Sequence, residues 1–157
     1  MKHHAIAAAN EIIRLGRRDD VLVSNLTLHQ FIYLLQGHGL ATSGENLLDE
    51  QPLALQYGPI YRTVYYAFRG YGAGPILAEE AFPFDDEHSP EWMSTDDVRG
   101  WQILEAVWDC YKDMPLRRMF RMTIQTGGPW HAAYRQGRSL PIAEASMLEY
   151  FSEGAQA

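Results

Sequence analysis

Histidine and cysteine are the residues of this chain best suited to binding a metal ion. A structural zinc site uses cysteine and histidine ligands at characteristic spacings. No two of the 6 histidines stand four residues apart, as they do in the HExxH motif, and Cys110 has no second cysteine to join it. The sequence therefore predicts no metal site beyond loose binding at His3 and His4, near the start of the chain.

The same residue types offer little for catalysis. Cys110 would act as a nucleophile only with a base beside it. It stands between Trp108 and Tyr111 on an expected apolar helix face, so we predict a small core residue. His131 is expected in the first turn of a helix rather than as a general base. We predict no catalytic residue, no cofactor and no enzyme activity; an enzyme that uses Cys110 or a histidine is the alternative.

Acidic residues and glycines gather in two further stretches. Asp85, Asp86 and Glu87 share one loop, whereas an acid–base pair needs two environments that separate its pKa values, so we expect a solvated acidic patch. The glycines of residues 70–74 close an expected helix, whereas a phosphate-binding loop follows a strand and opens a helix. They therefore indicate a helix stop.

Arginines and tyrosines in two segments point to a partner surface. Tyrosine and arginine dominate protein interfaces, and both crowd residues 57–71. In residues 115–126, Arg117 and Arg121 share one helix face, which favours either a solvated face or a patch for an acidic partner or nucleic acid. The predicted partner-binding residues are Arg62, Tyr66, Arg69, Arg117, Arg118 and Arg121.

A mainly helical fold must position these residues. Apolar residues at spacings of three and four predict helices over 5–16, 60–71, 95–113, 115–126, 129–136 and 141–152. A further helix starts at Thr27, with Gln30 at the spacing of a capping box; Gly37 and Gly39 loosen its end and Gly44 caps it. Pro59 suits the first position of the helix over 60–71.

Short strands are expected near residues 47–56 and 76–84. The predicted fold class is mainly α (α+β): a single compact domain over residues 1–157, with about seven helices and a small antiparallel β element.

Composition argues against several classes of protein. The formal charge of −7 repels phosphate backbones, which argues against a nucleic-acid partner. A single cysteine allows no internal disulfide and fits a reducing cytoplasm. No stretch approaches the ~20 apolar residues that span a bilayer, and the first residues lack a signal-peptide core, so we expect no membrane association.

Several blocks occur in a characteristic order along the chain. Residues 26–36 resemble an LT-x-x-x-LQ-K-L-x-Y-x-x-Q block, residues 54–59 an E-A-W-x-Y-G-P block, and residues 64–72 a V-Y-x-x-F-x-x-Y-G helix. Further blocks lie at 5–15, 44–50, 103–111, 123–130 and 142–151. Together they resemble the Panacea domain, the SocA- and GepA-like, phage-associated family of bacterial and phage antitoxins. The residues that carry this signature, mainly structural by the resemblance, are Thr27, Gln30, Tyr57, Gly58, Pro59, Tyr65, Phe68, Gly72, Trp108, Tyr111, Pro129 and Trp130.

The resemblance implies an antitoxin that neutralises a cognate toxin by direct contact, in the cytoplasm of a bacterial or phage-infected cell. One branch of the family delivers its toxin to a cytoplasmic protease. The chain departs from the pattern at His29 to Ile32, where the family favours Leu-Gln and Lys-Leu, at Leu55, where tryptophan is usual, and at Ile124, where histidine is usual. The loss of the family's lysine weakens the alternative function, a DNA-binding regulator with a winged-helix-like fold.

Overall fold

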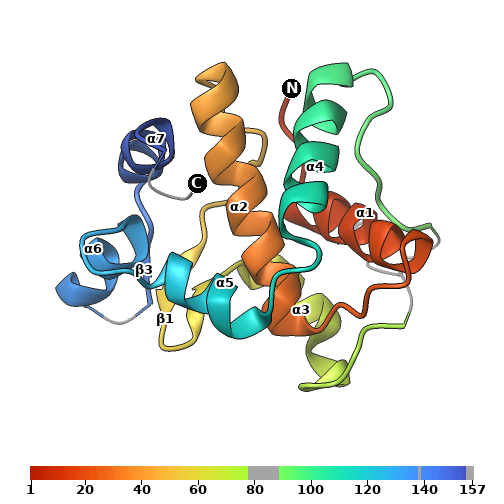
Figure 1. Cartoon of the computed structure of the whole chain (residues 1–157), viewed down its shortest axis with the longest axis horizontal. Coiled ribbons are helices and arrows are strands. Elements are labelled where there is room, and N and C mark those ends of the chain that lie inside the picture. The colour runs from red at the N-terminus through yellow and green to blue at the C-terminus, as the bar shows by residue number, and fades with distance from the viewer. Residues whose placement is uncertain (78–88, 138, 155–157) are drawn as a thin grey trace.

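The computed structural model describes residues 1–77, 89–137 and 139–154. Within this described part the chain forms seven α-helices and a small antiparallel sheet, which confirms the predicted fold class (Figure 1). The helices are α1 (Ala5–Arg18), α2 (Asn25–Ser43), α3 (Arg62–Phe68), α4 (Val98–Tyr111), α5 (Leu116–Thr123), α6 (Pro129–Gln136) and α7 (Glu144–Ser152). The strands are β1 (Leu53–Leu55), β2 (Gly58–Ile60) and β3 (Leu140–Pro141), and a 3-10 turn, η1 (Arg69–Tyr71), follows α3.

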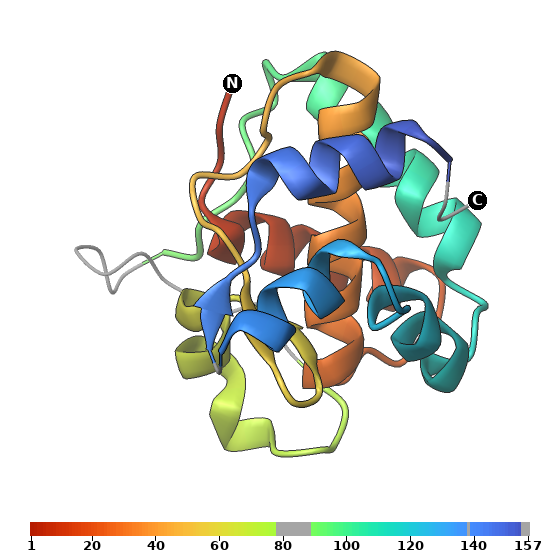
Figure 2. The ribbon, with the colours of Figure 1, turned by 90° about the vertical axis from the view of Figure 1, so that its left-hand side faces the viewer.

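Helix α2 lies at the centre of the molecule. The other helices surround it in both views of the ribbon, and it contacts α1, α4, α5, α7 and β2 (Figures 1 and 2). Every residue from 28 to 37 is buried, which is the pattern of a helix inside a core rather than on a surface. Polar side chains in this stretch must therefore find their hydrogen-bond partners inside the protein.

Two glycines let neighbouring segments approach α2 closely. A Cβ on Gly37 would lie 2.2 Å from the ring of Phe151 in α7, and one on Gly39 would lie 2.8 Å from Leu47. The prediction that Gly37 and Gly39 loosen the helix end is wrong, because α2 continues to Ser43. Gly44 caps the helix with a φ of 74°, as predicted.

The start of α2 differs from the predicted capping box. Ser24 is the N-cap, and its side chain accepts a hydrogen bond from the backbone N–H of Thr27. Thr27 and Gln30 thus lie inside the helix, and the predicted helix start at Thr27 is two residues late. Ser24 has the same short hydroxyl side chain, so the sequence offered two N-cap candidates three residues apart.

The sheet has the strand order β2-β1-β3 in the described residues, and both pairs are antiparallel. Leu53 lies opposite Ile60, and Leu55 lies opposite Gly58, so residues 56–57 form the turn of a hairpin. Pro59 belongs to β2 and not to the first turn of α3, which corrects that prediction. The third strand comes from residues 140–141, where the sequence predicted the start of a helix.

Two predictions concern residues that lie partly or wholly outside the described part of the chain. The strand expected at 76–84 and the acidic loop at Asp85, Asp86 and Glu87 lie largely outside the described residues. Only residues 76–77 of the expected strand are described. There the Ile76 N–H donates to the carbonyl of Val23, 2.8 Å away. No helix in the described part of the chain has both the length and the apolarity needed to cross a membrane.

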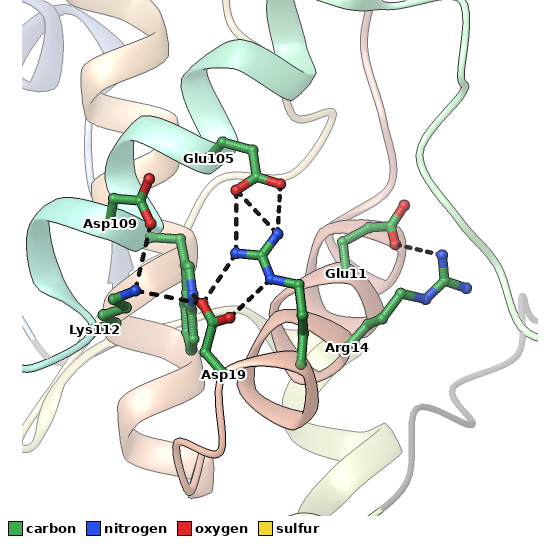
Figure 3. Close-up of polar contacts among 8 residues, drawn as sticks. Glu11, Arg14, Asp19, Glu105, Asp109 and Lys112 are labelled. Atoms are coloured by element: carbon green, nitrogen blue, oxygen red, sulfur yellow. Dashed lines mark hydrogen bonds and ion pairs between the residues drawn. The ribbon is translucent and has the colours of Figure 1, made fainter.

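An ionic cluster joins the end of α1 to α4 (Figure 3). The Arg18 guanidinium pairs with Asp19 at 2.9 Å and with Glu105 of α4 at 3.0 Å. The indole N–H of Trp108 donates to Asp19 at 2.7 Å, and Lys112 lies 3.5 Å from the same carboxylate. The hydrogen bonds from Arg18 and Trp108 hold the pKa of Asp19 well below its usual range.

Close packing at Gly37 predicts a stability loss on adding one methyl group. In Gly37→Ala the new Cβ would overlap the Phe151 ring, which is confined by edge contacts with Tyr33 and His38. We expect a net loss of about 1–2 kcal/mol, because overpacking exceeds the helix-propensity gain of alanine. Thermal unfolding should show a Tm lowered by roughly 2–8 °C.

Gly70→Ala is the matched control, because a Cβ there meets no atom within 4 Å. Its Tm should stay within about 1 °C of wild type, as expected for an unconstrained surface site. Equal Tm values for the two variants would contradict the proposed packing of α7 on α2.

A candidate partner-binding groove

A surface groove of about 590 Å³ lies between the start of α2, the β1–β2 hairpin and the segment of α3 and η1. Its walls include Tyr57, Tyr65, Tyr66, Arg62 and Arg69, and we call it the tyrosine groove. The predicted partner-binding residues Arg62, Tyr66 and Arg69 thus line a single hollow. The groove has the size of a typical ligand site in proteins.

The tyrosines are exposed because local structure leaves them no core to join. Tyr57 lies in the hairpin turn and is 61% exposed. Helix α3 buries Val64 and Phe68, so Tyr65 and Tyr66 lie outside that buried face, 49% and 54% exposed. The rings of these two residues meet edge to face, with centroids 5.5 Å apart. A cluster of large aromatic side chains left in water is typical of an interaction surface.

The groove carries positive charge. Arg62 and Arg69 are exposed, and neither pairs with a carboxylate in the described part of the chain. The Arg69 guanidinium lies 5.2 Å from the centre of the Tyr66 ring. A planar guanidinium beside an aromatic ring is well placed to bind a carboxylate or phosphate.

A buried histidine forms part of the groove's floor. His29 of α2 is 2% exposed, yet it lines the groove. Its Nδ1 accepts a hydrogen bond from the backbone N–H of Tyr61 at 3.1 Å. An imidazole that accepts at Nδ1 carries its proton on Nε2 when it is neutral. That Nε2 is buried and has no hydrogen-bond partner among the described residues. Burial lowers the pKa of His29 to about 4, so the ring is neutral at pH 7.

A buried polar network holds the frame of the groove. The Tyr61 hydroxyl donates to Gln36 Oε1 at 2.5 Å, and the Gln36 amide donates to Asn46 and to the Glu50 carbonyl at 3.1 Å each. The Glu50 carboxylate in turn accepts from the backbone and hydroxyl of Thr63. These bonds fix the start of α3 against α2.

A second hollow continues the groove toward α5. It is lined by Leu26, Gln30, Tyr57, Leu116, Arg117 and Phe120, and so shares Leu26 and Tyr57 with the groove. Gln30 is buried, and its Oε1 has no partner among the described residues. Arg117 therefore lies beside the groove. Arg118 and Arg121 are exposed on α5 and line neither hollow.

The other chemistry-bearing residues lie apart from the groove. Cys110 is exposed, so the prediction of a core cysteine is wrong: α4 buries Trp108 and Tyr111 on a face that leaves position 110 outside. His131 Nδ1 accepts from the Gly127 N–H. In the described residues no group of three or more His, Cys, Asp or Glu side chains is placed to hold a metal ion.

The residues at the start of the chain have partners within the protein. His3 is buried and lies 2.7 Å from Asp97, which also caps α4. His4 lies 3.2 Å from Asp49 and 2.5 Å from Glu91.

The signature residues fall into two groups in the structure. The buried ones are Gln30, Gly58, Pro59, Phe68, Trp108, Tyr111, Pro129 and Trp130. Thr27 is half-buried, and Tyr57, Tyr65 and Gly72 are exposed and line the groove. The indole of Trp130 donates to the Leu55 carbonyl, which joins α6 to the hairpin.

Sequence reasoning had missed His29 as a site residue. The available signal was a histidine inside an apolar run, at a position where the resemblance led us to expect leucine. The group that donates to its Nδ1, the Tyr61 N–H, lies 32 residues further along the chain, so spacing in the sequence could not show which ring nitrogen carries the proton.

Fold and groove together define a mainly helical domain with an aromatic, basic surface hollow. The chain belongs to the family described as antitoxin SocA-like, Panacea domain, whose model matches residues 28–131. This match confirms the resemblance seen in the sequence, and it spans every predicted partner-binding residue. No curated protein matches the chain, and no solved structure does.

The buried histidine predicts a pH dependence of stability. The pKa of His29 is about 4 in the folded protein and near its ordinary 6.5 when unfolded, so the unfolded chain binds the extra proton between these values. Stability is therefore fully present above pH 6.5 and falls as the pH drops toward 4. From pH 7 to pH 5 this one group should cost on the order of 2 kcal/mol.

Urea unfolding at pH 7, 6 and 5 measures this effect, with His29→Leu as the comparison. Burial also lowers the pKa of His38, but that contribution is common to both proteins. The stability of wild type should fall more steeply with acid than that of the variant. Parallel curves would show that His29 takes up its proton as readily in the folded state as in the unfolded one.

Proposed function

We propose that this chain is an antitoxin that neutralises a cognate toxin by direct protein contact, with the tyrosine groove as part of the contact surface. The observation that carries the proposal is the exposure of Tyr57, Tyr65 and Tyr66 beside Arg62 and Arg69 in a member of an antitoxin family. Tyrosine and arginine are the residues most enriched at binding hot spots, and hot spots cluster around hollows.

The contact surface extends to α5 in this proposal. Arg117 adjoins the groove through the second hollow, and Arg118 and Arg121 add positive charge on the same helix. A partner with an acidic surface would be attracted to this region at long range, although the chain as a whole is acidic. The proposed setting is the cytoplasm of a bacterial or phage-infected cell, and the mechanism requires no cofactor and no chemical turnover.

Two mechanisms of neutralisation, sequestration of the toxin and delivery of the toxin to a protease, have different requirements. Sequestration needs only the complex, whereas delivery also needs a cytoplasmic protease in the cell. Rescue of growth in a host that lacks its ATP-dependent proteases would therefore assign the mechanism to sequestration. Loss of rescue in that host, with the complex still formed, would assign it to delivery.

The exposed arginines of α5 also support a second candidate, a DNA-binding regulator. The formal charge of −7 opposes this function. A gel shift with the upstream DNA at moderate salt separates the two candidates: a salt-sensitive complex at sub-micromolar protein favours the regulator.

Co-expression with the product of the neighbouring reading frame tests the antitoxin proposal. We expect the neighbour alone to stop growth, the wild-type chain to restore it, and the two products to co-elute. Arg62→Glu with Arg69→Glu should weaken the complex at least tenfold, because both charges face the proposed contact. Calorimetry on the purified pair measures the Kd.

Arg99→Ala is the control, since Arg99 is exposed on α4 and does not line the groove. Its complex should bind as tightly as wild type. Growth rescue without any complex, or a complex indifferent to the charge reversal, counts against contact through the groove.

The proposal also predicts that the reactive side chains are dispensable. Cys110→Ala and His131→Ala, made separately, should each restore growth as wild type does, because neither residue lines the groove. Loss of rescue in either variant, with the fold intact by circular dichroism, would favour the enzyme alternative.

A further inference from the structure

Two consecutive residues of α2 have buried polar atoms without partners at the tyrosine groove and its extension. His29 lines the groove and Gln30 lines the second hollow, and the buried Nε2 of His29 and Oε1 of Gln30 have no hydrogen-bond partner among the described residues. Buried polar groups in native proteins are nearly always hydrogen-bonded, so unpaired atoms on residues that line these two adjoining hollows, among which is also the Oδ1 of Asn25 in the groove, require an explanation. A ligand that supplies the missing partners is one.

The tautomer of His29 determines what this ligand must offer. Because Nδ1 already accepts from the Tyr61 backbone, the neutral ring presents Nε2–H, a donor. The ligand must therefore bring an acceptor oxygen to His29. The unpaired Oε1 of Gln30 needs the opposite, an N–H donor. A peptide backbone offers a carbonyl oxygen and an N–H within one repeat unit.

The charge around the groove determines the side chain that such a peptide carries. Arg62 and Arg69 line the groove and have no carboxylate partner among the described residues. Arg117 lies on the second hollow. No aspartate or glutamate lines either hollow. An acidic side chain in the groove would therefore meet positive charge and no carboxylate among the residues that line the groove.

We infer that the tyrosine groove binds an extended acidic segment of the toxin. A backbone carbonyl of the segment accepts from His29 Nε2–H, a backbone N–H donates to Gln30 Oε1, and an aspartate or glutamate side chain pairs with Arg62 and Arg69. The exposed rings of Tyr57, Tyr65 and Tyr66 cover the remaining faces of the segment. This inference rests on the proposed function and specifies the part of the toxin that is recognised.

A nucleic-acid strand is the less suitable occupant. Its phosphates would satisfy the arginines, but the chain carries a formal charge of −7 that opposes a polyanion over its whole length. A short acidic segment brings a few charges to the one basic hollow and avoids this penalty.

Peptide selection against the purified full-length chain tests the inference. Random twelve-residue peptides displayed on phage are selected on the immobilised protein, with excess soluble Arg62→Glu/Arg69→Glu double variant present to remove peptides that bind elsewhere. We expect the survivors to share an aspartate or glutamate at one position. Replacing that residue by asparagine or glutamine should weaken binding at least tenfold.

The role of His29 needs its own readout. In a nitrogen-15 spectrum the Nε2–H resonance of His29 should shift downfield when a selected peptide is added, because it gains an acceptor. His29→Leu should bind the peptide at least tenfold more weakly, and Arg99→Ala should bind as wild type does. Should His29→Leu fail to fold, the Nε2–H shift in the wild-type chain still tests the hydrogen bond from His29, and the exposed single variants Arg62→Gln and Arg69→Gln test the pairing with the acidic side chain without touching the core.

The inference is overturned if no peptide is enriched, if the enriched peptides share no acidic residue, or if they bind the groove variants as well as wild type. It is also overturned if a 20-base-pair DNA duplex binds at 150 mM salt, loses binding in the groove variants and displaces the peptides. Growth rescue by co-expression separates the two claims: rescue with a failed selection leaves the antitoxin function standing and removes this groove from it.

Discussion

The burial of α2 on every side over residues 28–37 is the constraint on which the rest of the structure depends. A helix in that position cannot give its polar side chains to water, so His29 and Gln36 bond to groups from residues 46–61. Those bonds determine where the β1–β2 hairpin ends and where α3 begins. The core helix thereby orders the segment that carries the groove, and the groove's frame is built before any partner arrives. Such pre-organisation lowers the entropy cost of binding.

The same arrangement separates scaffold from contact surface within one short segment. Tyr61, Val64 and Phe68 face inward and fill the core, while Tyr57, Tyr65 and Tyr66 face the groove. Outward positions carry few packing constraints, so a substitution there would alter the contact surface while the inward positions keep the fold. The histidine at position 29 shows that a change in the floor of the groove is also accommodated, because the Tyr61 backbone supplies a partner for one of its nitrogens.

Much of the fold could be predicted from the sequence, because strong apolar periodicity marks the helices and Gly-Pro or paired glycines mark their limits. Helix ends were predicted less well: Ser24 rather than Thr27 caps α2, and α4, capped by Asp97, begins at Val98, three residues after the expected start. The strand at residues 140–141 could not be foreseen, because it pairs with β1 more than 80 residues earlier. Of the site, Arg62, Tyr66 and Arg69 followed from composition and the helical wheel, whereas the exposure of Tyr57 and Tyr65 was not predicted. The groove itself could not be predicted from the sequence, because it joins α2, the hairpin and α3. Its floor also depends on the tautomer of the buried His29 ring.

Hydrogen–deuterium exchange on the chain, alone and with the neighbouring gene product bound, tests the central claim most directly. Amides of the hairpin turn, of α3 with η1, and of the first turn of α2 border the groove. We expect the partner to slow exchange in these three segments together and to leave exchange on the exposed face of α4 unchanged. Protection confined to α4 or α7, with the groove segments exchanging as in the free protein, would contradict this expectation.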